Sequence, residues 1–334
     1  MSPRGAARGH ARTGRSDRGR RAPLPEPALR SVVRPGQAGQ RARGGGRRAL
    51  AQVIHRRFTL AVPDAEAGEC LRGDVRLPEG PPPREAVVVV HGFKGFKDWG
   101  FFPWTCERLA AEGYAAVSFN FSRCGVGEDD PQAFSELERF ARNTFTREQA
   151  ELDVLLDAVR DGTLLQPRPQ RVALLGHSRG GGGAVLAAAR RDDVDALVTW
   201  AAVARFDRWS DETREAWRRD GRVWILNTRT GQQMPLDVGL LDDFEAHRER
   251  LDIASAAARV RVPWLIVHGR DDATVPEEDA RILARQASDA RLHLIEGAGH
   301  TFEARHPFDG VPPALDEAMT VTLRHLDRAL GPRS

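Results

Sequence analysis

The pattern of apolar positions becomes regular at residue 53. Residues 53–62 and 70–77 are typical of two strands joined by a short polar turn. Residues 86–90 read Ala-Val-Val-Val-Val, an apolar and mostly β-branched run without alternation. A strand buried on both faces of a sheet has this texture, because neither row of its side chains meets water. The chain therefore predicts a sheet whose centre is fully covered.

Strands and helices then alternate along most of the remaining chain. The pattern predicts strands at 115–120, 171–175, 196–200, 262–267 and 291–295, and helices at 104–112, 147–160, 182–190, 278–286 and 313–330. Alternation at this spacing is typical of parallel strands joined by crossover helices. We therefore expect an α/β fold with a mostly parallel, doubly wound sheet of about eight strands and helices on both faces.

One segment, residues 204–260, breaks this alternation. It holds Trp209, Trp217 and Trp224 among many charged residues, together with a helix-like stretch at 240–250. We expect a small helical lid, inserted over the carboxyl ends of the strands. Its tryptophans either line a substrate pocket or form the core of the lid itself, and the sequence leaves both alternatives open.

Residues 1–52 differ from the rest in composition and charge. Residues 1–48 hold thirteen arginines and two acidic residues, a net charge of +11, so the remainder carries −8 of the overall +3. A segment with so few large apolar residues cannot offset its ordering entropy, so we expect a disordered Arg/Gly/Pro-rich tail before a folded domain at 53–332. The tail fits a misassigned translation start, a nucleic-acid-binding arm or an organellar transit peptide.

Composition also narrows the compartment and the chemistry. The sequence has no run of about 18 apolar residues that would predict a membrane helix, and no apolar stretch of a secretory signal. Its cysteines, Cys70, Cys106 and Cys124, match neither a disulfide framework nor a zinc-binding spacing. We expect reduced thiols in a cytoplasmic protein that needs no metal or organic cofactor.

A catalytic motif follows the predicted strand at 171–175. Gly176-His177-Ser178-Arg179-Gly180 has the form G-x-S-x-G between a strand and a helix, which is the setting of a nucleophile elbow. The tight turn lifts the serine hydroxyl above the sheet edge and needs small residues on either side, where a Cβ would clash with backbone. We expect Ser178 to be a nucleophile. Glycines 180–183 are unfavourable inside a helix and predict close packing of that helix on the sheet.

A serine nucleophile needs a base and an orienting carboxylate, in the chain order Ser, then Asp or Glu, then His. Asp271 and Asp272 follow one predicted strand and His300 follows the next, so all three lie at the carboxyl edge of the sheet. His306 is a rival base. From position alone, either aspartate could be the acid or could cap the following helix.

Two backbone donors would complete this site by stabilising an oxyanion. One is the N–H of the residue after the nucleophile, Arg179. The other is expected in the loop after the strand at 86–90, where Phe93 directly follows His91-Gly92. His91 precedes the serine in the chain, so we expect it to be a hydrogen-bonding scaffold residue rather than the base.

Four segments carry a family resemblance: residues 91–100 (HGFKGFKDWG), 176–181, 268–276 and 297–300. With them, residues 53–330 resemble the α/β-hydrolase superfamily, above all a bacterial branch of dienelactone-hydrolase-like and serine-aminopeptidase-like lipases and esterases. In relatives the acid is usually the fifth residue when the His of the His-Gly pair is counted as the first, which selects Asp272. Dienelactone hydrolases use a cysteine nucleophile, so Ser178 speaks against that activity. The stretch 227–235 is similar too, without an implied role.

The resemblance and the motifs together favour a serine hydrolase that cleaves carboxylic esters of small or medium acyl groups through an acyl-enzyme intermediate. An aminopeptidase or amidase would use the same residues, but it needs an amine anchor, for which the lid offers Asp242, Asp243, Glu245 and Glu249. A non-catalytic binding protein has no need of a Ser, an Asp and a His in this order. We expect a small-molecule ester or amide as partner and no membrane, while only the tail suggests nucleic acid.

Overall fold

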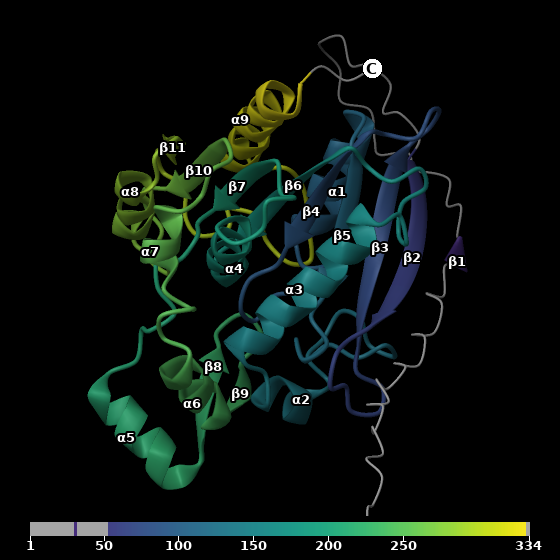
Figure 1. The fold of residues 1–334 in the computed structure, drawn as a ribbon. Helices are drawn as coiled ribbons and strands as arrows, with labels where there is room; N and C mark the ends of the chain where they lie inside the picture. Colours follow the sequence, from purple (N-terminus) through teal and green to yellow (C-terminus); the bar gives the residue numbers. More distant parts are fainter. Residues whose placement is uncertain (1–29, 32–52, 332–334) are drawn as a thin grey trace, which may run out of the picture.

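A computed structural model describes Arg30–Ser31 and residues 53–331 of the 334-residue chain. Within this part, nine strands form one sheet in the order β1-β2-β3-β5-β4-β6-β7-β10-β11 (Figure 1). The strands are β1 (Arg30–Ser31), β2 (Val53–Ala61), β3 (Cys70–Pro78), β4 (Glu85–Val90), β5 (Ala115–Asn120), β6 (Arg171–His177), β7 (Ala196–Trp200), β10 (Trp264–Gly269) and β11 (Ala290–Ile295). All pairs from β5 to β11 in this order are parallel and the others antiparallel, which confirms the predicted sheet.

The centre of the sheet is apolar on both faces, as the unbroken run at 86–90 predicts. Every residue of β4, β5, β7 and β10 is buried, whereas β2 and β11 contain exposed positions. Burial on both faces removes the most apolar surface from water where β-branched residues are densest. The strand ends at this centre are therefore rigid platforms for the loops that follow them.

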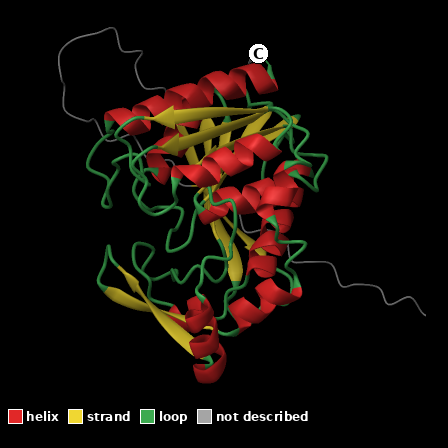
Figure 2. Ribbon diagram, turned by 90° about the vertical axis from the view of Figure 1, so that its left-hand side faces the viewer, coloured by secondary structure: helices red, strands yellow, loops and turns green. Residues whose placement is uncertain are grey.

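Helices cover both faces of the sheet (Figure 2). They are α1 (Phe102–Ala111), α2 (Leu137–Ala141), α3 (Phe145–Arg160), α4 (Arg179–Ala188), α7 (Ile253–Ala257), α8 (Glu277–Gln286) and α9 (Pro313–Leu330). Helix α1 packs on β3 and β5, α4 on β6 and β7, and α9 on β7, β10 and β11. Because the strands from β5 to β11 are parallel, the loops after β4, β6, β10 and β11 all leave the same edge of the sheet.

The segment predicted to be a helical lid contains a β-hairpin as well as helices. We define the insertion as residues 211–246. It consists of α5 (Asp211–Asp220), the antiparallel pair β8 (Arg222–Asn227) and β9 (Gln232–Asp237), and α6 (Gly239–Ala246). Figure 2 shows the hairpin set apart from the main sheet. Helix α7 packs on α4 and α8 and belongs to the main domain instead.

The tryptophans differ in their surroundings. Trp217 is fully buried, and its indole Nε1–H donates to the Leu236 carbonyl at 2.8 Å. The Trp209 ring lies 5.2 Å from the Trp217 ring and 6.1 Å from Phe244. Trp224, by contrast, is 57% exposed on β8. Trp217 therefore lies in the core of the insertion, and Trp209, which precedes the insertion in the chain, packs against that core.

Two further expectations from the sequence concern the N-terminal tail and membrane-spanning helices. The tail at 1–52, whether disordered or a misassigned start, lies outside them except for β1, which pairs antiparallel with β2. None of the helices in the described part of the chain combines the length and the apolar character needed to cross a bilayer.

The packing of the insertion predicts unequal effects of two tryptophan substitutions. Trp217→Leu should lower the free energy of unfolding by about 2–4 kcal/mol, because it removes buried surface and the hydrogen bond from the indole to the Leu236 carbonyl. Trp224→Leu should change it by less than about 0.5 kcal/mol. Urea titration followed by far-ultraviolet circular dichroism measures both, and equal effects would contradict this assignment of the core.

Candidate active site

Ser178 sits at the turn between β6 and α4, in the backbone conformation that a nucleophile elbow requires. Its φ of 57° and ψ of −122° lie in a region that residues with a Cβ rarely adopt. Its N–H donates to the Trp200 carbonyl at 2.9 Å, which ties the turn to the end of β7. Strand β6 runs two residues beyond the predicted 171–175, and α4 begins at Arg179 rather than 182. The serine is therefore the hinge between strand and helix.

Glycines let α4 approach the neighbouring loops closely. A Cβ built at Gly180 would lie only 2.6 Å from the Val90 carbonyl oxygen and would also clash with that of His91. At Gly183, the last of the four, the nearest atom is the Nε2 end of the Gln149 side chain, at 3.1 Å. The predicted close packing is thus observed, and backbone oxygens enforce it at Gly180.

His300 and Asp272 join Ser178 in a chain of hydrogen bonds. His300 follows β11, and its Nε2 lies 3.0 Å from Ser178 Oγ. Its Nδ1 lies 2.7 Å from Asp272 Oδ2, just after β10. The serine hydroxyl can donate to Nε2 while Nδ1–H donates to the carboxylate. The structure thus brings together the three side chains that the sequence singled out.

The Asp272 side chain is fully buried and held by the loop in which it lies. Its Oδ1 accepts the N–H groups of Thr274 and Val275 at 2.8 and 2.9 Å. Burial alone would raise the pKa of this carboxyl, but the hydrogen bond from His300 and the two backbone donors hold it below its usual value. The group therefore stays ionised at neutral pH.

The two rival residues point elsewhere. Asp271 is exposed, whereas Asp272 is buried against His300. His306 Nδ1 accepts the Gly100 N–H at 3.0 Å, and its ring packs against Phe96 and Trp99. The geometry therefore favours Asp272 and His300 over both rivals.

The loop after β4 lies directly against the nucleophile. A Cβ at Gly92 would come within 2.9 Å of Ser178 Cβ, so only glycine fits there. Phe93 follows, and Arg179 opens α4, where the first backbone N–H groups of a helix have no partner within the helix. These two N–H groups are the expected oxyanion donors. His91 contacts backbone, with Nδ1 at 2.9 Å from the Gly92 oxygen, as expected of a scaffold residue.

The Arg179 side chain forms one wall of the site. Its guanidinium pairs with Glu148 through two contacts of 3.0 and 3.1 Å. Its Cζ lies 4.3 Å from the Phe145 ring centre and 5.0 Å from that of Phe93. The positive charge is thus neutralised by Glu148, and the guanidinium also packs against the two aromatic rings.

Two histidines that sequence reasoning did not assign hold the loops of the site. His177 Nε2–H donates to the His300 carbonyl at 2.9 Å, and burial lowers its pKa to about 3, so it stays neutral. His268 Nε2–H donates to the Val275 carbonyl at 2.8 Å, beside the Asp272 carboxylate. His177 directly precedes the serine in its motif, and His268 is the histidine of the His-Gly pair. This placement in the motifs is the only sequence signal that could have indicated their roles.

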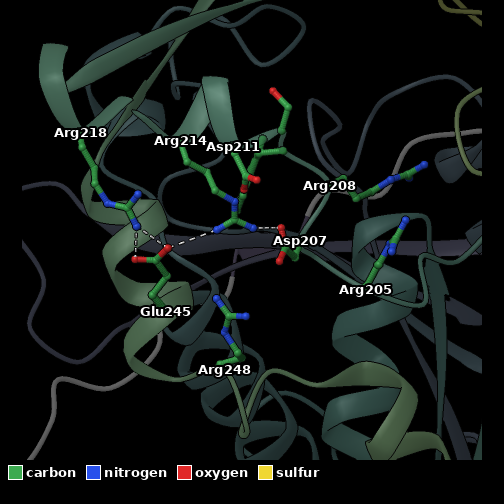
Figure 3. Close-up of a pocket in the computed structure, with 10 residues that line it drawn as sticks. Arg205, Asp207, Arg208, Asp211, Arg214, Arg218, Glu245 and Arg248 are labelled. Carbon is green, nitrogen blue, oxygen red and sulfur yellow. Dashed lines mark hydrogen bonds and ion pairs between the residues drawn. The ribbon is translucent and has the colours of Figure 1, made fainter. Parts of the chain in front are cut away.

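A hollow of about 740 Å³ is lined by residues of the insertion and by the segment that leads into it (Figure 3), and Ser178, Asp272 and His300 are not among its lining residues. Its lining is strongly charged and comprises Arg205, Asp207, Arg208, Trp209, Ser210, Asp211, Arg214, Arg218, Glu245 and Arg248. Arg214 pairs with Asp207 and Glu245, and Arg218 also pairs with Glu245. Within the described residues, no group of three or more His, Cys, Asp or Glu side chains is placed to hold a metal ion.

Residues 87–312 match the model of the alpha/beta hydrolase family. The chain belongs to this family. It is 28% identical over 204 residues to the 2,6-dihydropseudooxynicotine hydrolase of Paenarthrobacter nicotinovorans. The aligned region covers 59% of this chain and 47% of that protein. It is also 28% identical over 246 residues to the esterase EstD of Thermotoga maritima, covering 65% of the chain and 54% of that protein. The chain thus spans about half the length of these relatives.

Solved structures show the same fold at low identity. A putative hydrolase from Agrobacterium vitis superposes with a TM-score of 0.61 and 19% identity, over 82% of this chain and 98% of that one. Such a match extends beyond the segment that the family model covers. It supports the assignment of the whole described domain to one fold.

Alanine at two glycines of α4 should separate close packing from helix propensity. Gly180→Ala should both destabilise the protein and lower kcat/KM, since its Cβ would displace the backbone that leads into the loop after β4. Gly183→Ala should leave kcat/KM unchanged and alter stability by less than about 1 kcal/mol. Denaturation curves and hydrolysis kinetics check both. A Gly180→Ala protein with full activity would contradict the proposed constraint.

His177 should act as a positioning residue. His177→Phe keeps the ring contacts with Phe101 and Phe102 but loses the donor to His300, so kcat should fall about 10- to 100-fold with little change in KM. His177→Gln, which restores a donor, should recover part of that loss. Because His177 is already neutral, the wild-type rate should show no titration from it above about pH 5. Equal loss in both variants would point to a packing role alone.

Proposed function

We propose that the chain is a serine hydrolase that cleaves carboxylic esters of small or medium acyl groups through an acyl-enzyme intermediate. The observation that carries this proposal is the hydrogen-bonded series Ser178–His300–Asp272, with separations of 3.0 and 2.7 Å. A serine hydroxyl is a weak nucleophile by itself, and this arrangement supplies both a base and a group that orients the base.

In the first half of the reaction, Ser178 Oγ attacks the ester carbonyl carbon while its proton moves to His300 Nε2. The charge that develops on the carbonyl oxygen is stabilised by the N–H groups of Phe93 and Arg179. Asp272 stays ionised and stabilises the imidazolium that forms. The tetrahedral intermediate collapses when His300 returns this proton to the alkoxide leaving group, which departs as an alcohol.

In the second half, His300 takes a proton from a water molecule that attacks the acyl carbon. The same N–H groups stabilise the second oxyanion. Collapse breaks the bond to Ser178, and His300 gives the proton to Oγ, so the acid product leaves and the serine is restored. Each step uses the contacts between Ser178, His300 and Asp272 in turn, and the reaction consumes one water molecule.

The relatives support this class of reaction. One is named an esterase and another a hydrolase, although each shares only 28% identity with this chain. We further propose that the insertion acts as a lid, because Lys94 in the loop after β4 donates to the carbonyl of Leu226 on its hairpin at 3.1 Å. A lid in this place would restrict which acyl groups reach the serine.

An aminopeptidase or amidase is the second candidate, and the carboxylates of the insertion support it less well. Asp243 accepts the Thr146 N–H at 3.0 Å and also its hydroxyl, while Glu245 pairs with Arg214 and Arg218. These two carboxylates already have partners. An ester substrate needs no such anchor for an amine.

Substitutions of the three side chains should separate chemistry from folding. Ser178→Ala, His300→Ala and Asp272→Asn should each lower kcat on p-nitrophenyl esters by about 10³-fold or more. A fluorophosphonate should label Ser178 in the full chain, as intact-protein and peptide mass spectrometry would show. A panel of aminoacyl anilides, run alongside, should be turned over more slowly than the esters.

Asp271→Asn is the matched control for Asp272→Asn. The two aspartates are adjacent, but Asp271 is exposed, so its substitution should leave kcat within about twofold. Equal losses in both variants would argue against Asp272 as the orienting group. An active Ser178→Ala protein, or labelling at another residue, would overturn the proposed mechanism.

A further inference from the structure

Two cations lie beside the loop that carries Phe93, and neither pairs with a carboxylate of the described chain. Lys94 directly follows Phe93, and its Nζ donates to the Leu226 carbonyl at 3.1 Å. Arg229 lies in the turn between β8 and β9, with its guanidinium 4.6 Å from the Trp99 ring centre. Lys94 belongs to the main domain, and Arg229 belongs to the insertion.

Both cations lie close to the candidate site. Lys94 is two residues from Gly92, which touches Ser178, and its Nζ lies 5.8 Å from the Phe93 ring centre. Burial is the main cause that lowers the pKa of Lys94 and of His177, and the charge of Arg229 lowers both slightly further; the His177 ring lies 4.8 Å from the His300 ring. Arg229 therefore lies over Trp99 of the same loop, residues 91–100, that carries Phe93 and Lys94.

The lack of an acidic partner sets these two cations apart from their neighbours. Arg179 pairs with Glu148, and Lys97 pairs with Asp74 and Asp98. Burial lowers the pKa of both Lys94 and Arg229, although the Arg229 side chain is still exposed to solvent. For the half-buried Lys94, partial removal from water without a counter-ion is costly, and a bound anion would offset that cost.

No carboxylate of the described chain pairs with these two cations, although the domain is acidic overall. Residues 49–334 carry a net charge of −8, so acidic side chains are abundant across the domain. Two cations without acidic partners at one place in such a domain leave donors free for an external group. An arginine guanidinium matches the plane of a carboxylate, and a nearby ammonium adds a third donor direction.

We propose that Lys94 and Arg229 bind a carboxylate carried by the substrate, so that the preferred substrates are esters with an anionic group. This inference rests on the proposed esterase function and names its substrate class. Arg229 comes from the insertion, so binding of the anion and docking of the insertion on the loop after β4 would be coupled. The lid would then close best over a charged substrate.

The same contacts could instead serve only to anchor the hairpin to the main domain. In that case, removing either cation would lower stability and affect all esters alike. A carboxylate site predicts a selective loss, since the interaction exists for anionic substrates alone. The ratio of kcat/KM between matched esters separates the two roles.

The experiment uses two ester pairs with the full chain. The first pair is the mono-4-nitrophenyl ester of glutaric acid and 4-nitrophenyl pentanoate, which differ in charge on the acyl side. The second is 4-carboxyphenyl butyrate and 4-carbamoylphenyl butyrate, which differ on the alcohol side. In one of these pairs the anionic ester should be preferred about tenfold or more in kcat/KM, and Arg229→Gln or Lys94→Gln should reduce this ratio about tenfold.

Arg219→Gln is the control for the two variants. Arg219 also belongs to the insertion, but it is exposed on α5 and pairs with Asp220, so its substitution should leave both ratios unchanged. The preference should also weaken between 0.05 and 0.5 M salt, since screening shortens the range of the attraction. No anionic preference in either pair, or equal losses for both members of a pair, would overturn the inference.

A binding measurement keeps the inference testable apart from catalysis. If none of these esters is hydrolysed and Ser178 is not labelled, the proposed function itself fails. The affinity for glutarate, measured by isothermal titration calorimetry of the wild-type protein and the Arg229→Gln protein, then tests whether the anion site exists. Weaker binding to the variant supports the site, and absent or equal binding to both overturns it.

Discussion

The architecture of the site depends on how closely α4 can approach the end of β4. At Gly180 the Val90 oxygen leaves no room for a side chain, and at Gly92 the serine itself fills the space. This contact fixes the positions of Ser178, the first turn of α4 and the loop that contains Phe93 relative to one another. The base and the acid then need only reach this assembly from β11 and β10, whose ends lie at the same edge. A sheet buried on both faces supplies the rigidity that such spacing requires.

Much of this arrangement could be predicted from the sequence, because it follows from local patterns. The buried run at 86–90 predicts the centre of the sheet, and the glycine-bounded Ser178 predicts the elbow. The choice of Asp272 over Asp271 depended on a family resemblance, since two adjacent carboxylates after one strand look alike in sequence. The structure distinguishes them by burial, which depends on where the loop turns back.

The features that escaped prediction depend on contacts between distant segments. Strand β8 (RVWILN) is largely apolar, but β9 (QQMPLD) opens on two glutamines and contains a proline, so the pattern predicts this hairpin only weakly. One face of β8 is exposed, including Trp224. The contact of Arg229 with Trp99 joins two loops that no periodicity connects. The bond from His177 to the His300 carbonyl likewise needs the fold before it can be seen.

The separation of these residues along the chain has a consequence for biosynthesis. His300 meets Ser178 across 122 residues and meets His177 across 123. During translation, the elbow emerges long before the segment that supplies its base. A nascent chain therefore holds a serine hydroxyl with no group to activate it, and contacts of such long range form only when the last strands join the sheet. The proposed nucleophile thus gains its proposed base only when β11 has been added, so that completion of the sheet and assembly of the site are one event.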